Sequence, residues 1–554
     1  MIRHALLSLA AGALAALAPA VSAAEADPPA AGPPDPAALC APGTVIGTID
    51  VECVNVFDTS IPAENKGIYR AANWVHSINL TRESRVRSLL IVRPGDPCDL
   101  ERLAEAEREL RDLPFLSDAW VEPISREGNE VRVRVRVRDS WSTRIGISAG
   151  IAGGSERATF RIVERNLLGT GVGLGWRYQK NIDRTLRTFE LYAPSLTRQR
   201  WQVDALYSDN SDGFQRTLVV SRPFFSLDTP WNSLVSADRR ELEQKVYDFG
   251  EEVDVWRRRY EGAKAMFGWA RPRAPGGNVL RWFGGVRRLA EEWERVDPAR
   301  PIPVPEVAPP EPDAWLVEGG FEWIVPRFLK TTFLDSGRRV EDVDLSTRLM
   351  VSVGRSVASL SESRAFELEA TASTGFAIDE RNTLLLRGSQ LARMSGGDWY
   401  DVLTTLNAEY YFKPAPLHTT FFSLSAARGE DLPSTSQLLL GADTGLRGYA
   451  ARQFDGDRMF LLQGEHRIFL SREWLRLVRV AFVGFLDVGL AWGSEERLSW
   501  SDLRSDAGVG ARVSLLRGTR GAGLAAYAGY PLNRDGLPED ENGWQFTVFT
   551  FTGF

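Results

Sequence analysis

Residues that could perform chemistry are sparse in this sequence. The pentapeptide GISAG at 146–150 fits G-x-S-x-G, the pattern around the nucleophilic serine of many hydrolases. Such a serine needs a strand, a sharp turn and then a helix, whereas GISAG leads through a Gly-Gly pair into another strand-like segment. The histidines beyond the N-terminal segment stand in no recognisable triad context: His76, His418 and His466. We therefore expect no hydrolase activity.

Sites for metals, cofactors and nucleic acids are not expected either. No cluster of Cys and His has metal-ligand spacing, and no glycine-rich loop could hold a phosphate. The 554 residues include 66 basic and 73 acidic ones, so no basic excess favours nucleic acid. VRVRVRVR at 131–138 alternates as a half-buried strand with a solvated Arg face does, which we favour over a docking site for acidic partners. The expectation is a protein that is not an enzyme, with no metal and no cofactor.

The N-terminal residues predict export. Residues 1–24 hold an Arg, an Ala- and Leu-rich stretch and then small residues, the pattern of a secretory signal peptide. Residues 25–43 are rich in Pro and Ala without periodicity and predict a disordered spacer. Beyond them no uncharged apolar run of 18 residues occurs, which excludes a bundle of membrane-spanning helices. An oxidising compartment permits one disulfide, and the sequence leaves its pairing open among three cysteines: Cys40, Cys53 and Cys98.

Residues 44–139 predict a small α+β domain. Its second helix is the clearest element, because Asp99 can cap it, leucines recur at helical spacing and Pro114 can stop it. One strand, two helices and a closing hairpin make a compact unit of about a hundred residues. The expected elements are a strand at 44–57, helices at 81–90 and 99–113, and strands at 118–124 and 130–138.

The remainder of the chain, residues 140–554, shows the pattern of strands only. Segments of about ten residues with alternating apolar positions recur between turn-forming clusters, as in QRWQVDALYS at 199–208. Many such strands in an exported protein predict a closed transmembrane antiparallel β-barrel with its apolar side outward, because only closure leaves no unpaired edge in lipid. Counting segments predicts up to twenty strands, with sixteen equally arguable. The segments begin near residues 142, 157, 171, 185, 199, 213, 231, 252, 278, 314, 344, 364, 382, 400, 418, 458, 477, 505, 520 and 543.

The connections and the last strand add detail. The Pro-rich segment at 294–315 has many residues without an amide donor, so we expect an outer loop there. Short links at 166–171 and 515–523 are expected as tight inner turns. The terminal strand has aromatic residues at alternate positions, as a lipid-facing strand with an interfacial girdle should: Trp544, Phe546 and Phe554.

An ordered series of motifs covers the last part of the chain and resembles a known superfamily. Leu446-Arg447-Gly448-Tyr449 looks like the [VL]RG[FY] loop motif of the outer-membrane barrels that carry periplasmic POTRA domains, the BamA, TamA and FhaC-like surface antigen family. Residues 44–139 are similar to a single POTRA domain. Further matching segments are QGEHR at 463–467, VGFLDVGLAWG at 483–493, DAGVGARVSLLR at 506–517 and YAGYPL at 527–532.

The resemblance implies a barrel of sixteen strands with a loop folded back into its lumen. Arg447 of that loop is then expected to pair with Asp487, with Glu465 as a nearby acidic candidate. A guanidinium suits this position because its planar fork can bind a carboxylate at two points while staying charged. Gly448 would permit the tight backbone turn, and Tyr449 would pack on the barrel wall.

The function that the resemblance implies is outer-membrane protein assembly, insertion or polypeptide translocation. The POTRA-like domain would lie in the periplasm and bind unfolded outer-membrane or secreted polypeptides along an exposed strand edge at 118–124. Outer-membrane lipids and accessory periplasmic proteins are the other implied partners. The barrel would open at a weak seam between 142–152 and 543–554. Two alternatives remain open, a dedicated exporter of one secreted protein and a passive outer-membrane pore.

Overall fold

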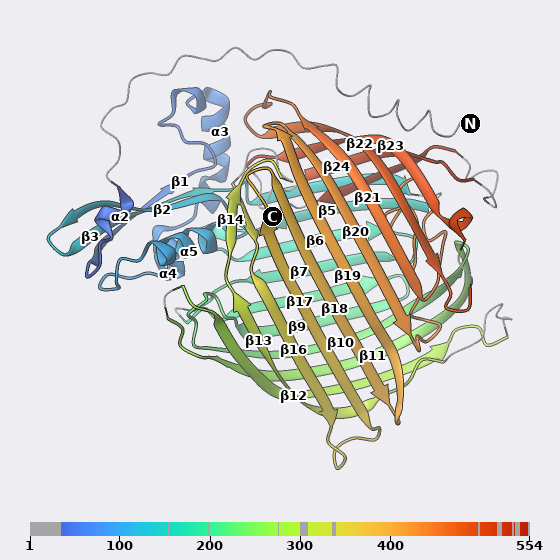
Figure 1. Ribbon diagram of the computed structural model, residues 1–554. Coiled ribbons are helices and arrows are strands. Elements are labelled where there is room, and N and C mark those ends of the chain that lie inside the picture. Colours follow the sequence, from blue (N-terminus) through green and yellow to red (C-terminus); the bar gives the residue numbers. More distant parts are fainter. Residues whose placement is uncertain are drawn as a thin grey trace.

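A small α+β domain lies against one mouth of a large antiparallel β-barrel (Figure 1). The structure is a computed structural model. No helix among the residues it describes is long and apolar enough to cross a membrane. The described residues are 35–152, 155–197, 199–274, 276–299, 308–334, 340–496, 499–517, 523–534, 537 and 543–551.

The sheet of the small domain has the order β1-β3-β2, with β1 parallel and β2 antiparallel to β3. The valines of the Val-Arg repeat in β3 are fully buried and pack with apolar residues of α4 and α5. The alternate arginines form exposed ion pairs, Arg132 with Asp50 and Arg134 with Glu122, so this face is solvated. The elements are β1 (Val45–Val54), β2 (Leu116–Glu127), β3 (Glu130–Asp139), α2 (Pro36–Leu39), α3 (Gly67–His76), α4 (Glu83–Leu89) and α5 (Leu100–Arg111).

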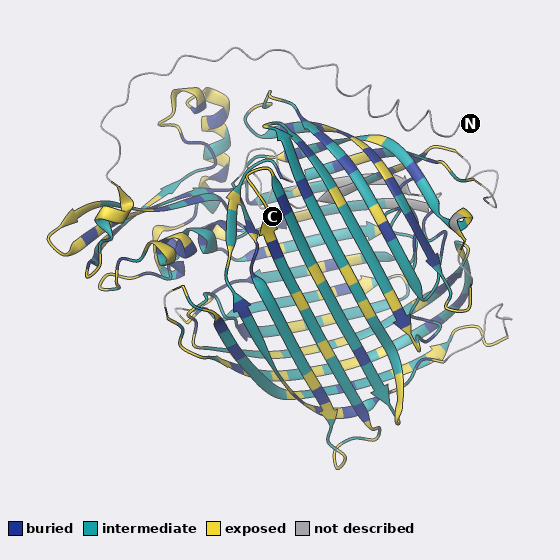
Figure 2. Cartoon of the chain, viewed as in Figure 1, coloured by how far each residue is buried: buried dark blue, intermediate teal, exposed yellow. Residues whose placement is uncertain are grey.

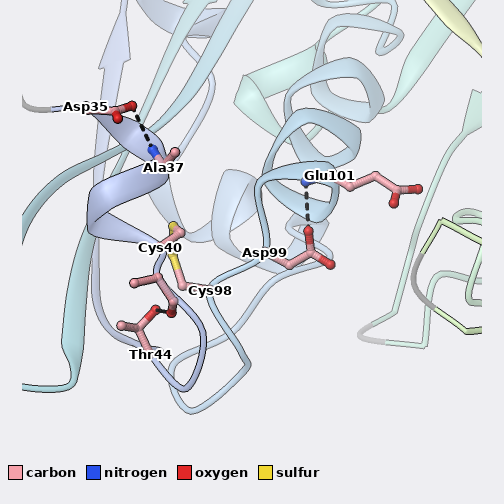
Figure 3. The surroundings of a disulfide bond; sticks show 8 residues. Asp35, Ala37, Cys40, Thr44, Cys98, Asp99 and Glu101 are labelled. Carbon is pink, nitrogen blue, oxygen red and sulfur yellow. Dashed lines mark hydrogen bonds between the residues drawn. A yellow bond between two sulfur atoms is a disulfide. The ribbon is translucent and has the colours of Figure 1, made fainter.

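Two features of this domain differ from the sequence-based expectation. Helix α3 was not predicted, and it lies in a long connection between β1 and α4. The prediction of disorder at 25–43 is wrong for its last residues, because Asp35 caps α2 and Cys40 forms a disulfide with Cys98 (Figure 3). This disulfide ties α2 to the segment just before α5 and leaves Cys53 as a free thiol. A covalent link of this kind mainly restricts the unfolded chain.

Twenty strands within the described ranges form the closed barrel, which confirms the segment count and not the sixteen strands that the resemblance implied. Consecutive strands pair antiparallel, and β25 lies beside β4 to close the ring. The strands are β4 (Thr143–Ala152), β5 (Ser155–Glu164), β6 (Gly173–Lys180), β7 (Thr185–Ala193), β8 (Gln202–Asn210), β9 (Gly213–Arg222), β10 (Trp231–Asp248), β11 (Glu251–Ala270), β12 (Val279–Arg295), β13 (Asp313–Val325), β16 (Thr347–Ser356), β17 (Ala365–Ala377), β18 (Asn382–Ser395), β19 (Asp398–Ala415), β20 (His418–Glu430), β21 (Arg458–Phe469), β22 (Val478–Trp492), β23 (Arg504–Leu515), β24 (Gly523–Pro531) and β25 (Gln545–Phe551).

The connections alternate between the two ends of the barrel because neighbouring strands are antiparallel. The link at 166–171 lies against the small domain, where the Arg82 amide donates to the Gly169 carbonyl at 3.3 Å. The link at 515–523 lies at the same end, although 518–522 fall outside the described residues. The connection between β12 and β13, residues 296–312, lies at the opposite end, so both ends of the loop predicted at 294–315 belong to the strands. A short hairpin of β14 (Phe328–Thr331) and β15 (Glu341–Asp344) extends from the domain end.

Exposed residues alternate with more buried ones along the strands of the barrel (Figure 2). On β22, Phe482 and Leu486 are exposed on the outside, whereas Asp487 is buried on the lumen side. On β25, Phe546 is exposed and Gln545 is buried. Apolar residues outside and charges inside are the pattern that a barrel in lipid requires.

Candidate functional site

The connection between β20 and β21, residues 431–457, is the candidate site. Its base is closed by a bridge between Leu440 and Phe454, and the Leu446 amide donates to the Gly441 carbonyl at 3.0 Å. Leu440, Leu446, Tyr449 and Phe454 are buried with Leu461 of β21 in one apolar cluster. The loop therefore folds against the inner wall rather than extending away from the barrel mouth.

Arg447 is held at the centre of this loop by two carboxylates of the wall. Its Nε and Nη2 donate to the two carboxylate oxygens of Asp487, each at 2.7 Å, and its Nη1 donates to Glu465. The guanidinium also lies 3.7 Å from the ring centre of Phe485 and 4.8 Å from that of Tyr527. Arg447 is 5% exposed and Asp487 is fully buried, so solvent screens this bidentate pair little.

Further charged groups of the wall complete the cluster. Arg467 Nε donates to Glu465 at 2.8 Å, and Arg512 Nη1 lies 3.8 Å from the same carboxylate. Asp506 is the cross-strand neighbour of Asp487 and is also fully buried. The cluster of Arg447, Arg467, Arg512, Glu465, Asp487 and Asp506 thus joins the loop to β21, β22 and β23. Three arginines face three acidic residues in it, so removing one member leaves buried charge without compensation.

The residues beside Arg447 fit the loop to the wall. The Tyr449 hydroxyl lies 2.9 Å from the Ser505 carbonyl and 3.0 Å from the Asn533 carbonyl, and its ring is almost fully buried. A Cβ on Gly448 would lie 2.5 Å from the Cβ of Asp506, closer than carbon atoms can approach. Glycine at this position therefore allows the backbone to contact the wall directly.

A second arginine connects the loop to a distant part of the barrel. Arg452 Nη1 and Nη2 donate to the two oxygens of Asp183, in the connection between β6 and β7, at 2.7 and 2.6 Å. Its guanidinium also lies 4.6 Å from the ring centre of Tyr247. The Tyr247 amide donates to the side-chain oxygen of Gln437 at 2.8 Å, and the side-chain amide of Gln437 donates to the Tyr247 carbonyl at 2.6 Å. The loop is therefore attached to β21, β22 and β23 through the Arg447 cluster, and to the β6–β7 connection and β10 through Arg452 and Gln437.

We expect Arg452→Ala to loosen the attachment of the loop to the β6–β7 connection without removing the Arg447 cluster. The double hydrogen bond to Asp183 is lost, which should cost about 1–3 kcal/mol for a partly buried charged pair. Single-channel recordings should then show more frequent openings than the wild-type protein. Arg428→Ala is the matched control, because Arg428 forms an exposed ion pair with Glu430 at the same end of the barrel. If Arg452→Ala opened no more often than the wild-type protein, the pair of Arg452 and Asp183 would not be what holds the loop in place.

At the other end of the barrel, helix α5 seats the small domain on the mouth. Arg111 Nε and Nη2 donate to the two oxygens of Asp342, in β15, at 2.6 and 2.7 Å. Glu105 accepts from the Leu227 amide at 2.7 Å, in the β9–β10 connection. The Arg108 guanidinium lies 3.5 Å from the ring centre of Phe328. Charged groups of one helix thus contact two separate connections of the barrel.

The strand edge at 118–124, expected to be free for a client strand, is partly occupied. The Val121 amide donates to Glu107 at 3.0 Å, and Arg111 donates to the Ala119 carbonyl at 3.0 Å. Pro123 has no amide hydrogen to offer. β2 is an edge strand of the sheet, as expected, but α5 side chains already bind two of its outward backbone groups. A client strand would have to displace contacts that also hold the domain to the barrel.

The junction between domain and barrel contains a buried acid. Asp139 ends β3 and is fully buried, and it accepts a hydrogen bond from the Thr81 amide at 2.9 Å. Asn166 of the β5–β6 connection donates to the Thr81 hydroxyl at 2.8 Å, and His76 Nδ1 lies 3.9 Å from Asp139. Burial raises the pKa of Asp139 to about 7 and lowers the pKa of His76. Both groups are thus stabilised in their neutral forms.

We expect Asp139→Asn to stabilise the domain at alkaline pH. The pKa of about 7 in the folded protein lies above the ordinary value of 3.8, so the free energy of unfolding falls as the pH rises from 3.8 to 7, and the whole loss is present above pH 7. Asn should remove this loss, roughly 2–4 kcal/mol at pH 8, and bring no gain near pH 4. Urea titrations of the full-length protein measure the free energy of unfolding of the domain. The helical circular dichroism signal reports on it because the described α-helices lie in this domain. An equal gain at both pH values would contradict the assignment.

Most of the residues predicted for the site lie together. Leu446, Arg447, Gly448, Tyr449, Glu465 and Asp487 meet at the inner wall, as the contacts above describe. Trp544 and Phe546 are exposed on the outside near the last strand, whereas Phe554 lies outside the described residues. Sequence reasoning missed Arg452, Asp183 and Asp506. Arg452 could have been noticed because it follows the loop motif closely, but nothing in the sequence connects it with a residue 269 positions away.

Comparisons with known proteins return structural similarities alone. No family model matches the chain, and no curated protein matches it. Among solved structures, it is similar to BamA from Haemophilus ducreyi lacking POTRA domains 1–3, with 13% identity over 92% of this chain and 85% of that chain and a TM-score of 0.37. It is also similar to CdiB from Acinetobacter baumannii (10% identity, 91% and 74% covered, TM-score 0.46) and CdiB from Escherichia coli (13%, 92% and 76%, 0.44).

Proposed function

We propose that this protein lies in the outer membrane and inserts polypeptides into it or moves them across it. The observation that carries the proposal is the inward-folded loop, which Arg447 and Arg452 attach to two sides of the lumen. A passive pore needs an open lumen, whereas a protein that translocates polypeptides needs a lumen that stays closed until a polypeptide arrives. The proposed mechanism involves no covalent chemistry, and we propose no enzymatic activity.

The outer surface of the barrel supports placement in a membrane. Large apolar side chains such as Phe482, Leu486 and Phe546 point outward and are exposed in the isolated chain. Lipid would remove this surface from water, and ring closure leaves no unpaired strand edge toward the lipid. The small domain, at the end where the chain enters the barrel, would then lie in the periplasm.

Strand lengths support a weak place at the ring closure. On one side of the closure β4 to β9 have 8 to 10 residues each, and on the other side β24 has 9, whereas β11 has 20 and β19 has 18. Because a tilted strand needs about 9–11 residues to cross a bilayer, the wall is barely tall enough beside the closure. A short wall thins the surrounding lipid, which lowers the barrier for an incoming hairpin. Clients are proposed to enter the membrane beside β25 and β4.

The test is a folding assay with purified full-length protein in liposomes. An unrelated outer-membrane barrel, added unfolded, should fold at least about tenfold faster than in empty liposomes, a difference of about 1.4 kcal/mol in its barrier. Liposomes that contain a simple porin provide the control for a barrel without an obstructing loop. A folding rate equal to both controls would contradict a general insertion role.

A dedicated exporter is the second candidate, favoured by the single small domain that the described residues contain and by its close attachment to the barrel. Deleting the gene separates the two functions. General insertion predicts that many outer-membrane barrels decline together, whereas dedicated export predicts the loss of one secreted protein. Both outcomes are measured by comparing the outer-membrane proteins and the secreted proteins of the deletion strain with those of its parent.

A further inference from the structure

Helix α3 exposes its apolar face. Ile68, Trp74, Val75 and Ile78 are all exposed, with Trp74 at 78% and Ile78, just beyond the helix, at 69%. Together with the exposed Ala71, they recur at the spacing of one helix face. A surface helix normally turns such a face to the core, and exposed apolar patches mark a surface that something else covers.

The opposite face of α3 is firmly packed, so its orientation is determined by the fold. Tyr69 is buried with Val56 and Phe57, and this cluster contacts Trp141 and Leu477 at the starts of β4 and β22. The Asn73 side chain exchanges hydrogen bonds with the Phe57 backbone at 3.1 and 2.8 Å. Burying the outer face of α3 by rotation would break these contacts.

The packing places α3 at the rim of the barrel, beside the ring closure. Glu64, just before the helix, accepts from Arg476 at 2.9 Å and from Arg517 at 2.7 Å, in the β21–β22 and β23–β24 connections. In Figure 1, α3 stands apart from α4 and α5, at the upper edge of the barrel mouth. The rim beside it is also apolar, because Leu475 and Ile145 are exposed there. The apolar face of α3 therefore continues the lipid-facing surface of the barrel.

We propose that α3 rests in the periplasmic leaflet of the outer membrane, with Trp74 and Ile78 among the lipid headgroups and upper acyl chains. The inference rests on the proposed placement of the barrel in that membrane. An interfacial helix needs an apolar face, an aromatic residue suited to the headgroup level and cationic groups for lipid phosphates. Lys66 and Arg70 are exposed at the start of α3, and the helix itself contains no acidic residue.

This contact would hold the domain against the lipid beside β4 and β25, where clients are proposed to enter. A helix that lies in the leaflet displaces headgroups locally and adds to the thinning that the short strands cause. It would also fix the orientation of the domain through lipid as well as through the ion pairs of α5. The alternative occupant, an unfolded client chain, is distinguished by the experiment below.

Spin labels in the full-length protein test the proposal. In a Cys53→Ser background that keeps the Cys40–Cys98 disulfide, single cysteines replace Trp74 or Ile78 and are labelled with a nitroxide. The protein is then placed in liposomes of phosphatidylethanolamine and phosphatidylglycerol. Phe482→Cys on the outside of β22 is the lipid reference, and Glu127→Cys on the β2–β3 hairpin is the aqueous reference.

The ratio of collisions with oxygen to collisions with a water-soluble nickel chelate should be several-fold higher at positions 74 and 78 than at position 127. A ratio at 74 equal to that at 127, with position 482 still shielded, would overturn the inference and leave the proposed function standing. Shielding at 74 that occurs only after unfolded client is added would also overturn it. Aqueous exposure at 482 would instead contradict the membrane placement itself. Heat-dependent mobility on gels verifies that each variant is folded.

Discussion

Arg447→Ala is expected to open the lumen and to reduce client folding by at least about tenfold. The substitution leaves fully buried Asp487 and buried Glu465 without their shared guanidinium, beside a third buried acid, Asp506. Breaking a buried ion pair from one side costs about 3–5 kcal/mol, which weakens the attachment of the loop to the wall. The stacking of the guanidinium on Phe485 is lost as well.

Conductance and the liposome folding assay measure this prediction in parallel. Arg447→Lys should be intermediate, because an ammonium keeps the charge but does not bind a carboxylate at two points. Arg428→Ala, at an exposed ion pair of the same barrel end, should behave as wild type. Wild-type conductance and wild-type folding rates in Arg447→Ala would show that the loop is held by other contacts.

Arg111→Ala is expected to release the small domain from the barrel mouth. Arg111 is almost fully buried, and its loss removes two hydrogen bonds to Asp342, one to the Ala119 carbonyl and the ion pair with Glu107. The expected cost is again about 3–5 kcal/mol, because these partners stay partly buried without a cation. Double electron–electron resonance between a spin label on the domain and one on the barrel should show a narrow distance distribution in the wild-type protein and a broad one in the variant.

Two further variants separate docking from folding of the domain. Asp342→Asn removes only the barrel partner and leaves Arg111 bound to Glu107 and Ala119, so it should release the domain with less effect on its helical signal. Arg132→Ala removes an exposed ion pair with Asp50 and should cost about 1 kcal/mol or less. A narrow distance distribution in both Arg111→Ala and Asp342→Asn would mean that other contacts suffice for docking.

Periodicity predicted the barrel well because each strand must turn an apolar face to lipid and a polar face to the lumen. This requirement acts on every strand separately, so all twenty predicted segments correspond to strands of the structure. The number of sixteen strands implied by the resemblance was wrong. The matching motifs lie in the last part of the chain, so they do not constrain how many hairpins precede them. Helix α3 was missed because it contains the β-branched residues Ile68 and Val75 and because no side chain caps its first turn.

The sequence by itself determined the order of the elements and the alternation of faces through local spacing, whereas the pairing of Arg447 with Asp487 was expected only from the resemblance of its motifs to a known family. Only the tertiary structure decided that Arg452 meets Asp183, that α5 occupies the edge of β2 and that the apolar face of α3 lies at the barrel rim. Each of these contacts joins residues whose side chains meet only after the ring has closed and the domain has docked. No local pattern specifies the partner, because the spacing of charged or apolar residues determines which face of a strand or helix they occupy but not what that face contacts.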